Sequence, residues 1–138
     1  MTLAEMPVPA DPDAPSPSLS QSDLQQLTEA ILAFRDERDW KQFHSLRHLI
    51  VSLNLEAAEL LELTQWKSDQ EMTALSTDAK GREALADECA DVLLYLLLLT
   101  AEAGIDLKAA ALAKIAKNAA KYPVHKARGS SRKYTELE

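Results

Sequence analysis

The sequence lacks the features that mark secreted and membrane-spanning proteins. It contains a single cysteine, Cys89, so no disulfide can form within the chain. Its first residues hold no basic segment followed by an apolar run, which is the pattern of a secretory signal peptide. The longest apolar run, Val92–Leu99, is too short to span a bilayer. These absences predict a protein of a reducing compartment, with the cytoplasm as the expected location.

An excess of positive charge is also missing. The 138 residues carry a formal net charge of −7 at pH 7, which argues against binding to nucleic acid or to an anionic membrane. A small phosphate ligand stays compatible with this charge, because a bound cation can reverse its sign locally. Glycine occurs only three times and aromatic residues make up 5%, whereas Ala, Leu, Glu and Lys are abundant. This composition favours helices over sheets.

Hydrophobic spacing predicts an all-α protein with four main helices. Apolar residues recur at helical intervals over approximately 20–36, 45–63, 78–103 and 107–121. The stretch 64–77 is polar and is expected to be a loop. Residues 1–18 hold five of the six prolines, which predicts a disordered Pro-rich tail. We expect one all-α domain over 19–125, followed by a basic C-terminal tail over 126–138.

Residues at the expected helix ends support these boundaries. Ser20 with Asp23 resembles a capping box, and Asp106 can cap the last long helix. Gly104 suits the position just after a helix, and Pro123 prevents continuation of the next one.

The run Val92–Leu99 also bears on assembly, because it is apolar around the whole circumference of a helix. Such a helix needs cover on all sides, which one small four-helix chain can hardly supply while also hosting an acidic cleft. The segment 107–121 is rich in alanine and permits close approach of another helix. We therefore expect a homo-oligomer whose interface is made by these helices.

One predicted helix carries glutamates inside an apolar stripe. Glu56 lies in the middle of this stripe, and Glu59 follows three residues later on the same face. Glu88 and Asp91 have the same spacing in a second apolar helix, with Tyr95 on their face. If the two helices pack antiparallel, four carboxylates can converge in one place.

Four adjacent carboxylates require neutralisation. Repulsion and desolvation would otherwise raise their pKa values until some of them protonate. Carboxylate oxygens are hard ligands suited to Mg²⁺, Mn²⁺ or Ca²⁺, and Mg²⁺ commonly takes substrate phosphates beside a few carboxylates. Such a cluster suits the hydrolysis of a phosphate ester or anhydride, with Mg²⁺ as the expected cofactor and Mn²⁺ as a substitute.

Other interpretations of the acidic pairs stay open at this level. Such pairs are common as solvated surface charges, and they could instead meet Lys or Arg of a partner in a non-enzymatic interaction module. Glu62 is rotated away from Glu56 and fits a surface charge better, with a contact at the edge of the cluster as the alternative. A di-iron bundle is disfavoured, because no Glu or Asp has a His three residues later.

The order and spacing of several motifs resemble one known family. E-A-A-E at 56–59 followed by E-C-A-D at 88–91 resembles the ExxE…ExxD signature of the all-α nucleoside triphosphate pyrophosphatases, the MazG-like superfamily. Similarity to its dCTP pyrophosphatase branch extends to R-D-W-K-Q-F-H, Q-W-K-S-D, D-V-L-L-Y-L and Y-P-V-H-K-A-R-G-S-S-R-K-Y-T. The resemblance covers about residues 24–137. It implies a four-helix MazG-like bundle assembled as a homodimer or homotetramer.

The resemblance also implies a reaction, the Mg²⁺-dependent cleavage of a nucleoside triphosphate between the α and β phosphates. The expected substrate is dCTP or a modified dCTP, with dUTP as the alternative, and the expected role is cleaning of the nucleotide pool. Water would be oriented or deprotonated by Glu59, with Glu56 or Glu88 as alternatives. The metal ligands implied by the family are Glu56, Glu59, Glu88 and Asp91.

The same resemblance implies contacts to the base, sugar and phosphates of the nucleotide. Two of these residues, Lys114 and Asn118, are four apart and share a helix face, where they can contact phosphate or sugar. Trp40 and Trp66 would line the base pocket, and Tyr95 would belong to the nucleotide site. The full set is Trp40, His44, Trp66, Tyr95, Lys114 and Asn118, with Arg47 as a further candidate.

Two positions depart from the animal members of this branch. Ile31 stands where those proteins have His, and Ala116 where they have Asp. A pocket without such a polar contact could accept other pyrimidines or modified cytosines. Both differences therefore concern the base preference rather than the chemistry.

Overall fold

The computed structural model describes residues 21–137, and every regular element among them is helical. The four long helices are α1 (Gln21–Glu37), α2 (Leu46–Glu62), α4 (Ala79–Glu102) and α5 (Leu107–Lys121). The short elements are η1 (Lys41–Phe43), α3 (Asp69–Thr77), α6 (Val124–Ala127) and η2 (Tyr134–Glu136). The predicted all-α class with four main helices is confirmed for this part of the chain. The tail predicted over 1–18 and the cap predicted at Ser20 lie outside the described residues.

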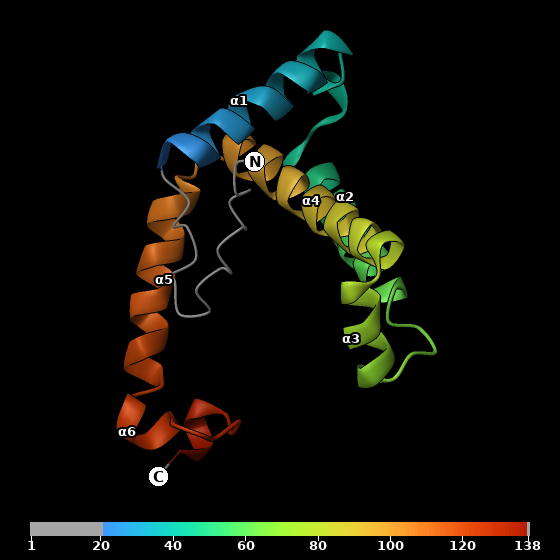
Figure 1. Ribbon diagram of the computed structural model, residues 1–138. Helices are drawn as coiled ribbons and strands as arrows, with labels where there is room; N and C mark the ends of the chain where they lie inside the picture. The colour runs from blue at the N-terminus through green and yellow to red at the C-terminus, as the bar shows by residue number, and fades with distance from the viewer. Residues whose placement is uncertain (1–20, 138) are drawn as a thin grey trace, which may run out of the picture.

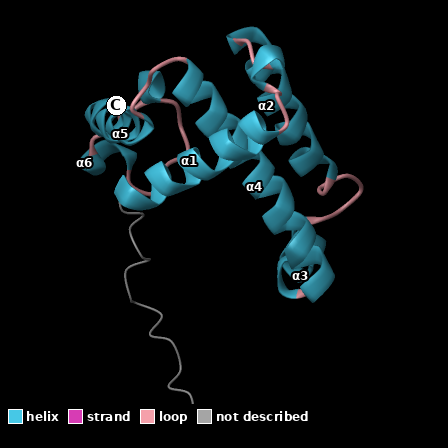
Figure 2. Cartoon of the chain, turned by 90° about the horizontal axis from the view of Figure 1, so that it is seen from above, coloured by secondary structure: helices cyan, strands magenta, loops and turns pink. Residues whose placement is uncertain are grey.

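α4 is the helix against which the other helices of the body pack. α2 lies beside it and runs in the opposite direction, α1 crosses its C-terminal half, and α3 packs near its N-terminus (Figure 1). The view from above shows the same crossing of α1 and α4 (Figure 2). Leu97 and Leu98 of α4 and Leu49 of α2 are the buried apolar side chains of this core. The apolar stripes seen in the sequence thus meet along the α2–α4 contact.

Side-chain caps begin three of the long helices where the sequence places them. Ser45 accepts a hydrogen bond from the backbone N–H of His48 at 3.2 Å, and α2 starts there. Asp78 and Asp106 accept from N–H groups in the first turns of α4 and α5, both at 2.9 Å. At the end of α4, Gly104 has a φ of 65°, the left-handed conformation that glycine adopts without strain.

The loop predicted over 64–77 is wrong, because α3 occupies Asp69–Thr77. Ser68 accepts from the N–H of Glu71 at 3.2 Å, and the Glu71 carboxylate accepts from the N–H of Ser68 at 2.7 Å. This reciprocal pair is a capping box, and its S-x-x-E pattern is present in the sequence. The polar composition of the segment concealed the helix, which depends on packing against α4 rather than on an apolar stripe of its own.

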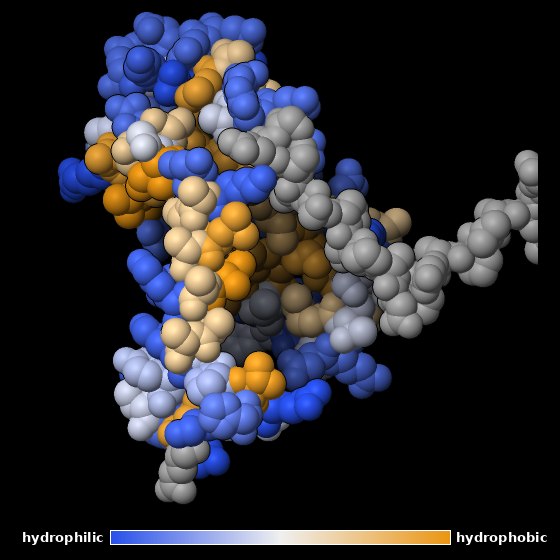
Figure 3. Space-filling view, turned by 90° about the vertical axis from the view of Figure 1, so that its left-hand side faces the viewer, coloured by the Kyte–Doolittle hydropathy of each residue, from blue (hydrophilic) through white to orange (hydrophobic). Residues whose placement is uncertain are grey.

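α5 extends away from the body formed by α1 to α4 (Figure 1), and all of residues 109–121 are exposed. Its Leu112 and Ile115 are 59% and 64% exposed. The face of the molecule on the α5 side gathers apolar side chains in a hollow (Figure 3). Beyond α5, the chain folds back so that the rings of Tyr122 and Tyr134 meet edge to face, 5.9 Å apart.

None of the described helices combines the length and the apolar character that a bilayer crossing requires.

The contact between α3 and α4 predicts the effect of adding one methyl group. A Cβ at Gly81 would lie 2.5 Å from the carbonyl oxygen and 2.8 Å from Cγ of Leu75. Gly81→Ala should therefore lose about 1–3 kcal/mol of unfolding free energy through overpacking, more than the roughly 1 kcal/mol that alanine gains in helix propensity. Urea unfolding followed by circular dichroism measures the difference. A variant as stable as the parent would contradict the close approach of the two helices.

Candidate functional site

Three carboxylates from α2 and α4 converge on the surface of the body. Glu56, Glu59 and Glu88 each offer an oxygen, and these oxygens all lie within 4.8 Å of one another. The antiparallel packing of the two helices brings Glu56 and Glu59 of α2 close to Glu88 of α4, although these residues are about 30 positions apart in the sequence. Asp91 is outside this group of close oxygens, although its charge acts on both Glu56 and Glu88.

The electrostatics of this cluster are unfavourable without a cation. Loss of solvation raises the pKa of Glu56, and the charge of Glu59 raises it further. The pKa of Glu88 is also raised, first by loss of solvation and then by neighbouring carboxylates, with a contribution from Glu62 at the edge of the cluster. Among the described residues, Oε2 of Glu88 is buried and has no hydrogen-bond partner. The donor set is therefore three hard oxygen ligands, one of them unsatisfied, which fits a divalent cation.

A cavity of about 390 Å³ opens between α1, α4 and the connector that joins α1 to α2. Its walls are mostly apolar and include Ile31 and Leu94. Four of the predicted site residues also line it: Trp40, His44, Asp91 and Tyr95. Asp91 thus lies between the cavity and the carboxylate cluster, so one ligand could occupy the cavity and reach the cluster.

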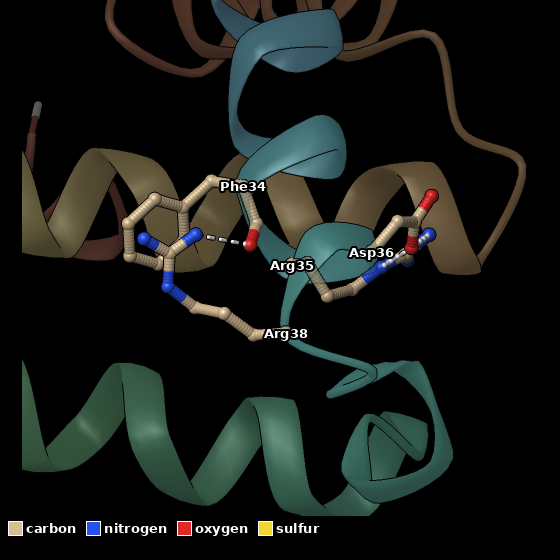
Figure 4. A network of polar contacts seen from close by, with 4 residues as sticks. All are labelled: Phe34, Arg35, Asp36 and Arg38. Carbon is tan, nitrogen blue, oxygen red and sulfur yellow. Dashed lines mark hydrogen bonds and ion pairs between the residues drawn. The ribbon is translucent and has the colours of Figure 1, made fainter.

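Polar contacts at the C-terminal end of α1 involve Phe34 and Arg35, two residues that line this cavity (Figure 4). The guanidinium of Arg38 lies 3.6 Å from the ring centroid of Phe34 and donates to its carbonyl oxygen at 2.9 Å. Phe34 meets Trp40 edge to face at 5.9 Å. Arg35 is only 6% exposed, and its Nε and Nη2 both lie 2.7 Å from Oδ1 of Asp36. No sequence pattern predicts the burial of Arg35, apart from the neighbouring Asp36 that balances its charge.

Several predicted nucleotide contacts lie away from this cavity. Trp66 is 92% exposed at the C-terminal end of α2, whereas Trp40 precedes its N-terminal end. A helix of 17 residues is about 25 Å long, so the two indoles cannot line one pocket within a single chain. Lys114 and Asn118 are exposed on α5, and Arg47 is exposed on α2.

A second cavity, of about 380 Å³, lies where α1 meets the end of α4 and the start of α5. None of the predicted site residues lines it. The residues that the structure brings together are therefore the three glutamates of the cluster and, beside them, the four predicted residues that line the first cavity.

The raised pKa values predict how the metal-free protein responds to pH. In the folded state, the pKa values of Glu56 and Glu88 are raised above the ordinary value of 4.5. The stability that these groups contribute is therefore fully present below pH 4.5. It is lost as the pH rises through the raised pKa values. In EDTA, Glu56→Gln should therefore be more stable than the parent at neutral pH, by a few tenths of a kcal/mol for each like-charged pair removed.

Thermal unfolding across a pH series measures this effect, with Glu83→Gln, on an exposed position of α4, as the control. A Glu56→Gln variant that loses stability at neutral pH would mean that Glu56 pairs with a cationic side chain instead.

Comparison with known proteins places this arrangement in a family. The sequence profile of the MazG-like family matches residues 51–137. Rat dCTP pyrophosphatase 1 is 44% identical over 93% of this chain and 74% of its own length, and the human protein is 45% identical over 88% and 70%. The crystal structure of a pyrophosphatase from Archaeoglobus fulgidus matches with a TM-score of 0.67 and 40% identity, over 72% of this chain and 92% of that one. The resemblance seen in the motifs is confirmed, and the chain belongs to the MazG-like family.

Proposed function

We propose that this protein is a Mg²⁺-dependent nucleoside triphosphate pyrophosphohydrolase. It converts dCTP, or a modified dCTP, to the monophosphate and pyrophosphate, and so removes unwanted nucleotides from the pool. The observation that carries the proposal is the cluster of three close carboxylates beside a cavity, in a chain whose relatives are dCTP pyrophosphatases.

We assign the metal to the carboxylate cluster on one face of the α2–α4 pair. Glu56, Glu59 and Glu88 would hold Mg²⁺, with Asp91 as the fourth carboxylate, and Mn²⁺ would substitute because it shares the preference for oxygen ligands. When bound, the ion neutralises charge on the triphosphate and on the leaving pyrophosphate. The unsatisfied Oε2 of Glu88 supports this assignment, because a cation is the partner that such an oxygen lacks.

Glu59 is the residue we assign to the attacking water. It is exposed, so water can reach its carboxylate, and it lies next to the other two ligands. Glu59 orients the water and accepts its proton as the oxygen attacks phosphorus. The bond between the α and β phosphates breaks, and pyrophosphate leaves with the bridging oxygen. Glu56 and Glu88 are the alternative bases.

The cavity is assigned to the base. Its volume of about 390 Å³ is within the range of small-molecule sites, and its apolar wall can cover the faces of a pyrimidine. Trp40 and Tyr95 offer aromatic surface to the base, and Asp91 marks the side toward the cluster. The triphosphate would then extend toward Glu56, Glu59 and Glu88.

We also propose that the protein works as a homodimer or homotetramer whose site is shared between copies. Residues 21–106 contain seven basic and seventeen acidic residues, whereas residues 107–137 contain eight basic and one acidic. The basic α5 of one copy is therefore complementary to the acidic body of another. Docking would cover the exposed Leu112 and Ile115. It would also bring Lys114 and Asn118, which lie far from the acidic cluster of their own chain, to the cluster of the other copy. Trp66 of a second copy could reach the base that Trp40 contacts.

Replacing the central ligand tests the reaction. Glu56→Gln should reduce Mg²⁺-dependent pyrophosphate release by at least about 100-fold, because metal and substrate lose one of their charged anchors. Glu83→Gln, at an exposed position of α4 outside the cluster, should keep parental activity.

The substrate panel for this assay contains all dNTPs and NTPs together with 5-methyl-dCTP. A preference for dUTP would favour the alternative specificity. An absence of release from every nucleotide, with Mg²⁺ or with Mn²⁺, would favour the non-enzymatic interaction module.

Mixed oligomers test the shared site. Glu59→Gln and Lys114→Ala should each be nearly inactive alone. When the two variants are co-expressed as a dimer, about a quarter of all sites would combine an intact acidic cluster with an intact Lys114, so activity should recover to about that fraction. The control pair, Glu56→Gln with Glu59→Gln, should stay inactive because both changes affect the same half of the site. Failure of the first pair to recover, with mixed oligomers demonstrated by mass spectrometry, would contradict sharing.

A further inference from the structure

The second cavity, of about 380 Å³, is not used by the proposed function. It lies where the first turns of α1 meet the end of α4 and the start of α5. Its walls include the half-buried Leu24 of α1 and the buried Leu97 of α4. Ile105, in the turn between α4 and α5, also lines it and is 50% exposed. An occupant of this cavity would therefore remove apolar surface from water.

Two of the charged groups at the rim of the second cavity already have partners. Asp106 accepts a hydrogen bond from the N–H of Ala109 at 2.9 Å, and Glu29 accepts one from the side-chain amide of Gln25 at 3.0 Å. The third charged group is Lys108, and no residue that the structure describes forms an ion pair with it. The apolar walls thus lead to a cation that lacks a counter-charge.

Lys108 is the first of four lysines on α5, a helix without an acidic residue. The other three, Lys114, Lys117 and Lys121, are three or four residues apart and share one face. Within residues 21–137, the ion pairs all lie at the C-terminal end of α1, so none of the four lysines has a carboxylate partner there. α5 is therefore complementary in charge to an acidic segment.

The same chain contains such a segment. The N-terminal segment, residues 1–20, holds Glu5, Asp11 and Asp13 and no basic residue. Asp13 lies eight residues before the first residue of α1, which allows a reach of about 26 Å at about 3.3 Å per residue. With its 15 residues, α5 is about 22 Å long, and its first turn lies at the second cavity. A segment that enters α1 beside this cavity can therefore bring its carboxylates to the lysines of α5.

Leu19 supplies an apolar anchor for the N-terminal segment. It directly precedes Ser20, the predicted cap of α1. An apolar residue at this position commonly packs on the fourth residue of the helix and fixes the direction in which the chain enters it. In α1 the fourth residue is Leu24, which lines the second cavity. The helix start therefore favours an entry of the chain along the cavity.

We propose that the N-terminal segment docks on its own chain, with Leu19 in the second cavity and the acidic residues against the lysines of α5. Because the segment is tethered beside the cavity, its effective concentration there is high, so a few weak contacts suffice. Contacts of this kind require neither a helix nor a strand in the segment, which agrees with its high content of proline.

The docked segment is autoinhibitory. This consequence rests on the function proposed above, in which Lys114 contacts the phosphates of the nucleotide. The carboxylates of the segment and the triphosphate compete for the same positive charge, so docking raises KM and leaves the chemical step at the glutamates unchanged. Salt weakens this competition by screening, because Lys114, Lys117 and Lys121 are exposed.

Carbodiimide cross-linking of the full chain tests the contact, because this reagent joins a carboxylate directly to a lysine that touches it. Oligomers assembled from an equal mixture of isotope-labelled and unlabelled chains separate links within one chain from links between chains in the mass spectrometer. Asp11 and Asp13 should be joined mainly to lysines of α5 in the same chain, rather than to Lys41, Lys67 or Lys80.

The anchor is tested by Leu19→Ser, which keeps every carboxylate of the segment. This variant should lose about 3-fold or more of the links to α5, because it loses the apolar contact with Leu24. Leu3→Ser is the matched control, since it makes the same change far from α1 and should keep the parental links. Melting temperatures verify that both variants are folded.

Steady-state kinetics test the autoinhibition. A triple variant with Glu5→Gln, Asp11→Asn and Asp13→Asn should have a KM for dCTP about 3- to 10-fold lower than the parent at low salt, with kcat unchanged. The two KM values should converge at high salt. Glu83→Gln removes an exposed carboxylate from the body instead and should keep the parental KM.

Three outcomes would overturn the proposal. Links spread evenly over all lysines would mean that the segment has no docking site, and links mainly between chains would place the segment of a second copy in the cavity. An unchanged KM in the triple variant would remove the autoinhibition. The cross-links form without nucleotide, so failure of the proposed function is seen separately, as an absence of pyrophosphate release from every nucleotide.

Discussion

The apolar contact between α2 and α4 is the interaction on which the site depends. Leu49 and Leu97 are 1% and 2% exposed, and burial of each such side chain contributes about 1.5–3 kcal/mol. A like-charged pair at helical spacing opposes folding by only a few tenths of a kcal/mol. The apolar contact therefore outweighs the repulsion and keeps carboxylates together that would separate if they were free. The repulsion that remains is what makes the cluster a good ligand set, because a divalent cation relieves it.

The bundle of a single chain leaves α5 uncovered, and under the proposed function this feature links assembly to catalysis. α4 packs with α1, α2 and α3, but α5 leaves the body and exposes apolar side chains. Residues 107–137, which begin with α5, carry eight of the fifteen basic residues of the described chain. Association that covers Leu112 and Ile115 would use the hydrophobic effect as its driving force. Because Lys114 lies on the same helix, this association would also deliver positive charge to the phosphates. Under the proposed function, a separate monomer would leave Leu112 and Ile115 exposed and would lack the positive charge of Lys114 at the phosphates.

Much of this arrangement could be predicted from the sequence, for physical reasons that differ between elements. The long helices follow from apolar periodicity and from the caps at Ser45, Asp78 and Asp106. The approach of Glu56 to Glu88 follows from their i, i+3 pairs once the two helices are antiparallel. Apolar periodicity does not predict α3, because the apolar stripe of this helix is weak. The S-x-x-E pattern of Ser68 and Glu71 does indicate its first turn. The cavity and the course of α5 depend on how helices cross and diverge, and no local pattern encodes those angles.

The cavity and the carboxylate cluster also differ in their electrostatics. Under the proposed function, the phosphates meet the strong charges of the glutamates and a cation, whereas the base lies against largely apolar walls. On the cavity side, burial lowers the pKa of His44, and the charge of Arg35 lowers it further. Asp36 balances the charge of the buried Arg35, so the walls of the cavity stay close to neutral while the cluster beside it carries a concentrated negative charge.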